Sequence, residues 1–349
     1  MEKDTFDYES TSPDRIEQCH ALLDNWLDQF QEQSSTEPLE QSKFLLMENH
    51  LRAVVDNMET LADIAEVSEE DKAIAVFIAT MHDKSRLTQA LIGDEDSKDQ
   101  INGRPHAAMS AIQALGKGKA HEMLQDKLWG LSEDDARWET IMNGVGQGIA
   151  YELFPDLTEG DETWGCLFHG ISLHMYPKDG VELSDLDYLT DRERFFLDLT
   201  VNADAAANLS HKFTDPDLTE HLMIVNGHTL DELINSQISP DVLRHALEKN
   251  APIDYKIITH DNRNQNAADW FVAWMLHVHG VTSPDVAAAL LDKGSLATMA
   301  EIVDYTDADT RAQMQQVSAK CIAHLEKVKA QKYPEEFPSS FNAPLPQSA

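Results

Sequence analysis

A largely apolar run of nine residues, 73–81, ends directly on the pair His82-Asp83. The spacing of its large side chains predicts a helix, and His82 falls on the buried side because it follows Ile78 by four residues. Burying a carboxylate beside an imidazole costs free energy unless something replaces the lost hydration, and a divalent cation does this well. The run therefore predicts a core helix whose end offers ligands to a metal ion, if other segments supply the remaining ligands.

Two further segments turn ligand-type side chains toward the expected core. His50 lies three residues after Met47 and four before Val54, on the apolar stripe of its segment. Asp204 follows Val201 by three residues and continues the stripe of a third segment. A mixture of histidine nitrogens and carboxylates suits Mn, Fe, Co, Ni or Zn, and also Mg. We therefore expect a divalent metal site between helices that are far apart in the chain.

The helical period of 3.6 residues recurs along the chain while strand signals are sparse, which predicts an all-α fold. In the later part, helices are expected over 240–248, 267–277, 283–291 and 310–329. A break at 211–222 is expected to divide the chain. The predicted organisation is a disordered N-terminus (1–12), a metal-binding helical domain (13–220), a C-terminal helical part packed on it (221–332) and a flexible tail (333–349).

The chain is strongly acidic, with 62 acidic and 27 basic residues and a net charge of -35. This charge argues against passive binding to a nucleic-acid backbone or to an anionic membrane, since both would be repelled. The three cysteines are far apart and indicate no disulfide framework. Residues 1–12 are polar, unlike a signal peptide, and no apolar run is long enough to span a membrane. We expect a soluble, cytoplasmic protein, and the sequence is compatible with a homo-oligomer.

The order His50, His82-Asp83 and Asp204 resembles the HD superfamily of metal-dependent phosphohydrolases. In that family a His, an adjacent His-Asp pair and a distant Asp lie on core helices around a metal. The local similarity is to the branch whose helix ends His-Asp-Ile-Gly-Arg-Phe-Glu-Gln. Residues 82–89 read His-Asp-Lys-Ser-Arg-Leu-Thr-Gln and keep the His, Asp, Arg and Gln. The resemblance spans residues 50–329 and implies an HD-type helical bundle with additional C-terminal helices.

The same resemblance adds two histidines to the candidate site. His106 is similar to a family histidine that follows a variable loop, and His174 matches an Ile-x-x-His element that precedes the last Asp. As metal ligands they would hold a second ion. As alternatives they are substrate contacts or core histidines, and His121 and His169 compete with them for these roles.

The chain departs from the branch pattern at two places. Lys84 and Ser85 replace the usual Ile-Gly, so that the turn after the ligands differs or Lys84 faces the substrate. The segment Asn-Ala-Asp-Ala-Ala around Asp204 keeps only Ala-Asp of the usual Asp-Ala-Asp-Lys-Leu-Asp.

The resemblance implies hydrolysis of a phosphoester, in a nucleotide or a related small phosphorylated molecule, by water that a metal activates. Asp83, or a neighbour such as Asp99, would guide the proton of that water. In so acidic a chain, an anionic substrate needs local positive charge, which Lys84, Arg86, Arg104 and the metal would supply. A guanidinium such as that of Arg86 can donate two parallel hydrogen bonds to two oxygens of one phosphate.

Three other functions stay open at this point. One is a di-iron oxygenase of the same superfamily, with His106 and His174 as extra ligands. Another is a non-catalytic regulatory or binding protein with a degenerate site, and the third is an interaction protein whose charge mimics nucleic acid. Each ligand also has a structural alternative: a hydrogen-bonded core histidine for His50, a paired mid-helix aspartate for Asp204, and a plain helix end for His82 with Asp83.

Overall fold

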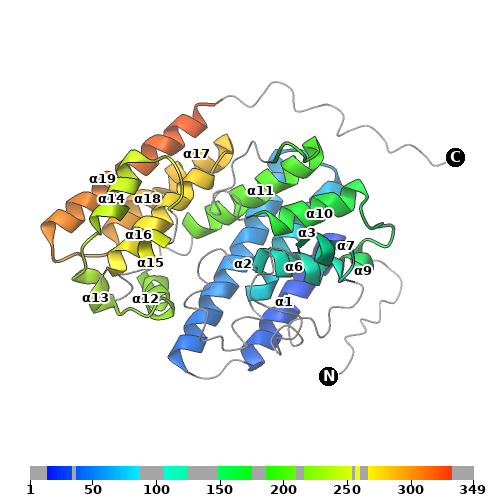
Figure 1. The fold of residues 1–349 in the computed structure, drawn as a ribbon, viewed down its shortest axis with the longest axis horizontal. Helices are drawn as coiled ribbons and strands as arrows, with labels where there is room; N and C mark the ends of the chain where they lie inside the picture. Colours follow the sequence, from blue (N-terminus) through cyan, green and yellow to red (C-terminus); the bar gives the residue numbers. More distant parts are fainter. Residues whose placement is uncertain are drawn as a thin grey trace.

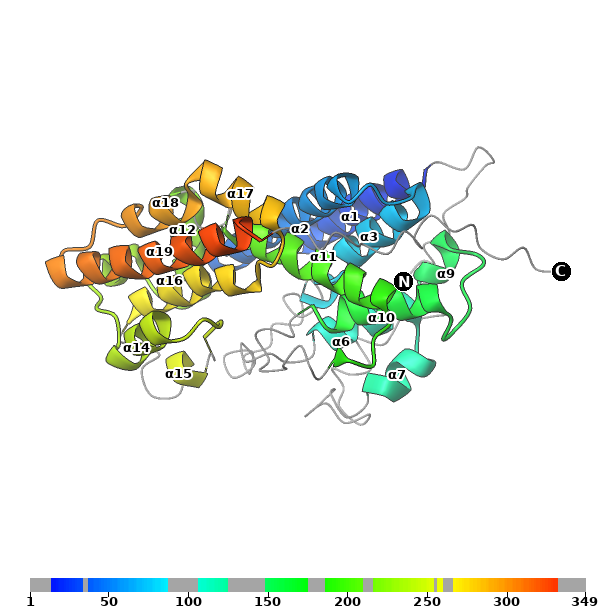
Figure 2. The same ribbon diagram turned by 90° about the horizontal axis from the view of Figure 1, so that it is seen from above.

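The computed structural model describes residues 14–33, 37–86, 106–124, 148–174, 186–209, 216–253, 256–259 and 266–331. Over these stretches the protein consists of helices and turns, with no β-strand (Figure 1). The predicted all-α class is confirmed for this part of the chain. The helices of the first part of the chain pack on one side of the molecule, and those of the later part lie beside them (Figure 2).

The helices of the first part are α1 (Arg15–Gln33), α2 (Pro38–Ile64), α3 (Glu69–Met81), α6 (His106–Leu115), α7 (Lys119–Leu124), α9 (Ala150–Leu153), α10 (Glu162–Ser172) and α11 (Asp191–Ala207). Those of the later part are α12 (Pro216–Val225), α13 (Leu230–Ile234), α14 (Pro240–Glu248), α15 (Lys256–Thr259), α16 (Ala267–Met275), the 3-10 helix η4 (Leu276–Gly280), α17 (Pro284–Lys293), α18 (Ser295–Glu301) and α19 (Ala308–Lys329).

Helix α3 is the central helix of the first part. The hydroxyl of Ser68 caps its N-terminus by accepting a hydrogen bond from the backbone N–H of Asp71 at 3.1 Å. Every residue from 73 to 81 is buried, because α1, α2, α6, α10 and α11 all pack against α3. The apolar run therefore ends inside the core, and His82 is the C-cap of the helix.

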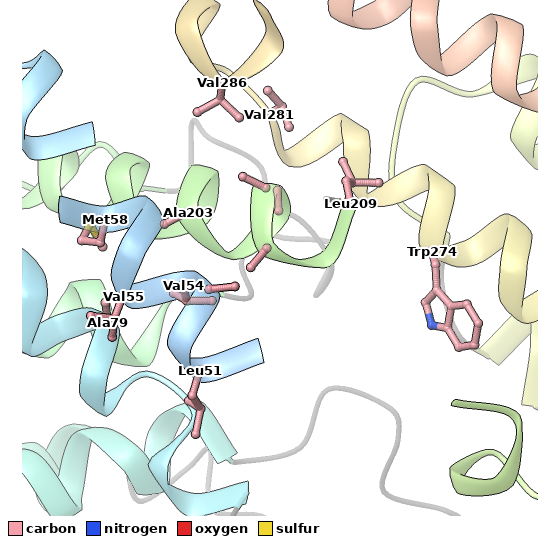
Figure 3. Close-up of a cluster of buried hydrophobic side chains, with 14 of the residues drawn as sticks. Leu51, Val54, Val55, Met58, Ala79, Ala203, Leu209, Trp274, Val281 and Val286 are labelled. Carbon is pink, nitrogen blue, oxygen red and sulfur yellow. The ribbon is translucent and has the colours of Figure 1, made fainter. Parts of the chain in front are cut away.

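Helices α2 and α11 flank α3 and approach one another closely. Buried side chains of α2 lie near Ala79 of α3 and Ala203 of α11 in the same cluster (Figure 3). The amide of Asn57 on α2 donates to the main-chain oxygen of Ala203 at 3.2 Å. A small residue at position 203 permits this approach, which brings the two helices to the end of α3.

The later helices share one continuous core with the first part (Figure 3). The link to α11 is polar as well as apolar, because Asn202 bonds to the segment between η4 and α17. Its Oδ1 accepts from the backbone N–H groups of Thr282 and Ser283, both at 2.9 Å, and its amide donates to the Thr282 hydroxyl at 2.8 Å. The later part is thus fixed to α11 two residues before Asp204.

A buried carboxylate organises the start of α14. Asp269 on α16 accepts from the backbone N–H of Ser239 at 2.7 Å and from its hydroxyl at 2.6 Å. Ser239 is the N-cap of α14, so the bond connects the two helices at their beginnings. The long helix α19 then packs against α14, α16, α17 and α18 and closes the later part.

The helices predicted for the later part are confirmed as α14, α16 with η4, α17 and α19, with ends that differ by a few residues. All three cysteines are free and buried. Residues 1–12 and 333–349, which we predicted to be disordered, lie outside the described residues, as do Asp99 and Arg104. Among the residues that the structure describes, no helix has both the length and the apolar character that crossing a bilayer requires.

The histidine pair His279 and His324, at the contact of η4 with α19, predicts an acid-sensitive later part. The rings are 4.6 Å apart, and both ring nitrogens of His279 are buried with no hydrogen-bond partner among the described residues. Burial, followed by the positive groups of His324, Lys320 and His245, lowers the pKa of His279 to about 3.

The unfolded chain takes up a proton at His279 near pH 6.5, whereas the folded chain does so only near pH 3. Stability is therefore complete above pH 6.5 and falls as the pH drops toward 3, with a slope of at most about 1.4 kcal/mol per pH unit from this group. Urea unfolding between pH 7 and 4 measures the slope. His279→Leu should flatten it and the control His121→Gln should not; equal slopes in all three proteins contradict the prediction.

Candidate metal centre

Three helices bring the first predicted ligand group together at one point of the core. Nε2 of His50, in the middle of α2, lies 3.4 Å from Nε2 of His82 at the end of α3. The same atom lies 3.3 Å from Oδ1 of Asp204 on α11 and 3.6 Å from Oδ2 of Asp83. All four side chains are buried. The residues selected by helical spacing therefore converge.

The other oxygen of Asp83 faces a second group of candidate ligands. Oδ1 of Asp83 lies 3.2 Å from Nε2 of His106, the first residue of α6, and 3.6 Å from Nε2 of His174, just after α10. These three residues, like His50, His82 and Asp83, offer ligand atoms that all lie within 4.8 Å of one another. The carboxylate of Asp83 thus joins two groups of histidines through its two oxygens.

Backbone carbonyls orient two of the imidazoles. Nδ1 of His82 lies 2.6 Å from the carbonyl oxygen of Ala79, and Nδ1 of His174 lies 2.7 Å from that of Ile171. Because a carbonyl only accepts, Nδ1 carries the hydrogen in both rings and Nε2 presents its lone pair. The lone pairs face Asp83, which is the arrangement that metal-binding histidines adopt.

His50 has no second polar role that would explain its burial. Its Nδ1 is buried with no hydrogen-bond partner among the described residues, whereas Nε2 contacts His82, Asp83 and Asp204. A structural core histidine would use both nitrogens. The geometry thus favours a ligand over a core histidine at this position.

The pKa shifts of Asp83 and His82 favour the protonation states that bind a cation. Burial raises the pKa of Asp83, but Arg86 first, and then His82 and His106, outweigh that effect, so its pKa lies well below the usual range. Burial lowers the pKa of His82 to about 4, although Asp83 opposes this shift. At neutral pH the centre therefore holds an ionised carboxylate and a neutral imidazole, the forms in which both bind metals.

Asn208 is a member of the site that the sequence analysis missed. Its amide donates to Oδ1 of Asp204 at 2.9 Å and to the main-chain oxygen of Asp204 at 3.0 Å. Asn208 and Leu209 lie in a π-helical turn directly after α11, a feature often found at functional sites. The signal was the spacing of four residues from Asp204, within a segment otherwise made of alanines.

The predicted basic residues Lys84 and Arg86 lie in different places. The ammonium of Lys84 lies over the ring of Trp26 on α1, 4.2 Å from its centre. Arg86 faces the cluster, with Nε 3.1 Å from both oxygens of Asp83. Of the two, Arg86 is therefore the one that contacts a candidate ligand.

Ser85, which stands where the resembled branch has Gly, holds the turn after the His-Asp pair. Its hydroxyl donates to the main-chain oxygen of His106 at 2.6 Å, and its backbone N–H donates to the hydroxyl of Ser110 at 3.0 Å. The turn after the His-Asp pair is thereby fixed to the start of α6, which places His106.

The competing histidines lie apart from this cluster. His169 on α10 bonds through Nδ1 to Oε1 of Glu193 at 3.1 Å and joins α10 to α11. His121 is part of the short helix α7. Neither belongs to the two groups that can hold a metal ion among the described residues.

Comparison of the chain with protein-family models, with curated proteins and with solved structures gives no match. Four imidazole nitrogens and two carboxylates, buried and converging, fit a divalent transition metal and can also accept Mg. The residues present are thus suited to hold one or two cations.

The hydrogen bond from Asn208 to Asp204 predicts a lower metal affinity when it is removed. Asn208→Ala should weaken Mn²⁺ binding by roughly 10- to 100-fold, because the Asp204 carboxylate loses the group that orients it. Binding is measured by calorimetry. The control is Asn226→Ala, which removes a similar bond from Asn226 to the main-chain oxygen of Leu222 on α12. Equal affinities in both variants would show that Asn208 does not position Asp204.

Proposed function

We propose that the protein is a metal-dependent phosphohydrolase of the HD type. The observation that carries this proposal is the position of the Asp83 carboxylate, with one oxygen toward His50 and His82 and the other toward His106 and His174. Together with Asp204, these residues would hold one or two divalent ions, of Mn, Fe, Co, Ni, Zn or Mg. The all-helical bundle and the chain order of the six residues support the same proposal.

A bound divalent ion would supply Lewis acidity and a water of lowered pKa. The chain contributes the rest. The carbonyl bonds of His82 and His174 fix the direction of their Nε2 atoms, and Asn208 fixes the Asp204 carboxylate. Since the candidate ligands are buried, they are shielded from bulk water.

The proposed substrate is a small phosphorylated molecule. A net charge of -35 repels anions at long range, so a phosphate needs a cation at the site itself. Arg86 meets this need, since its side chain is 40% exposed while it contacts Asp83. Lys84, which is held over Trp26, would act only if it left that ring.

A second candidate function follows from the number of histidines. Four imidazoles with a shared carboxylate also suit a di-iron centre, and oxygen chemistry at such a centre is the alternative for this fold. The two functions differ in what the protein consumes. Phosphate release without oxygen uptake supports the hydrolase, and oxygen uptake by the iron-loaded protein supports the oxygenase.

Loss of the shared carboxylate should abolish hydrolysis. With Mn²⁺ supplied, the wild type should release phosphate from at least one member of a panel of nucleotides and phosphomonoesters. Asp83→Ala should lower the rate at least about 100-fold, because both ligand groups lose an oxygen. The control is Asp56→Ala, which changes an exposed aspartate of α2. Release that survives in Asp83→Ala, or release from no substrate, contradicts the proposal.

A further inference from the structure

The guanidinium of Arg86 lies against the second ligand group. Its Nε is 3.1 Å from both oxygens of Asp83, and one terminal nitrogen is 3.3 Å from Nε2 of His106. Asp83 and His106 are two of the three residues that could hold an ion there, the third being His174. A cation of the chain itself therefore touches atoms that a second metal ion would need.

The chemistry of these atoms explains why a cation lies there. Oδ1 of Asp83 and Nε2 of His106 are only 3.2 Å apart. A guanidinium donates and never accepts, so its contact with His106 requires the lone pair of Nε2. That lone pair and the carboxylate oxygen are two acceptors side by side, and they repel unless a positive group lies against them. Arg86 supplies this group.

Among the described residues, the side chain of Arg86 is held only by the site itself. Its polar contacts with the described residues are with Asp83 and His106, and it is 40% exposed. Arg192 shows the contrast: its side chain is 19% exposed and bonds to Asp71 at 2.6 Å and to Glu162 at 3.3 Å. Arg192 is fixed between helices, whereas nothing described fixes Arg86 besides the site.

The turn that carries Arg86 does not depend on its side chain. The backbone N–H of Arg86 donates to the carbonyl oxygen of Asp83 at 2.9 Å. Ser85 holds the same turn to α6 through Ser110 and the main chain of His106. Replacing the guanidinium would therefore leave the backbone in place, so the side chain can be tested on its own.

We infer that Arg86 is a displaceable internal cation, which competes with the second metal ion for Asp83 and His106 and, once displaced, binds the phosphate of the substrate. This inference rests on the proposed function, since it assumes that both ligand groups hold metal. Displacement of Arg86 frees Asp83 and His106 for the second ion and frees the guanidinium for an anion. The second ion and the anion should therefore each strengthen the binding of the other.

The test is a calorimetric titration of the wild type and of Arg86→Gln with Mn²⁺, with and without inorganic phosphate. Without phosphate, Arg86→Gln should bind the second ion more tightly, by roughly 5- to 100-fold. The gain for the first ion should be smaller, because Arg86 contacts both Asp83 and His106 of the second group but only Asp83 of the first. Phosphate should raise the affinity of the wild type for the second ion, and this increase should be absent in Arg86→Gln. The matched control is Arg52→Gln, an exposed arginine of α2 that pairs with Asp24.

The results separate this inference from the proposed function. A second site that is unchanged or weaker in Arg86→Gln overturns the competition and leaves the metal centre standing, and so does a phosphate effect that persists in the variant. If none of the proteins binds an ion, both the proposed function and this inference are overturned. Circular dichroism and the thermal midpoint show whether the variant is folded, and Arg86→Lys, which keeps the charge, should lie between the two proteins.

Discussion

The buried carboxylate of Asp83 is the group around which the first half of the molecule is arranged. Each of its oxygens faces two imidazoles, and Arg86 contacts both oxygens. An ionised carboxylate left unpaired inside a protein costs several kcal/mol, about 3–5 when one partner of a buried pair is removed. The helices that meet here are therefore constrained together: α3 must end at this point, α6 must begin there, and α2, α10 and α11 must present a side chain to it.

The later helices are connected to this centre through α11. Asn202 fixes that helix to the segment before α17, and Asn208 orients the Asp204 carboxylate six residues further on. Between them, α11 packs on α2 through the small side chain of Ala203, where Asn57 reaches the main chain. A change in the packing of the later part would therefore be felt at Asp204. The C-terminal helices thus help to position a candidate ligand through their contact with α11.

Helical periodicity was sufficient to select His50, His82 and Asp204, because a ligand that faces the core must lie on the apolar stripe of its helix. It was also sufficient for the all-helical class. Periodicity describes one helix at a time, so it could not show which side chains meet across helices. The contact of Arg86 with His106 and the position of Lys84 over Trp26 depend on such meetings, and Asn208 was missed because it lies in an irregular turn just beyond α11. His106 and His174 came from the family resemblance, since no spacing rule links them to Asp83.

We propose that the Asp83 carboxylate is shared between two cation sites. Anomalous diffraction from crystals grown with Mn²⁺, recorded on both sides of the manganese absorption edge, tests it directly. We expect two peaks, one among His50, His82 and Asp204 and one between His106 and His174, with Asp83 in contact with both. Absence of any anomalous peak within this cluster, at a Mn²⁺ concentration that saturates binding in solution, would contradict it.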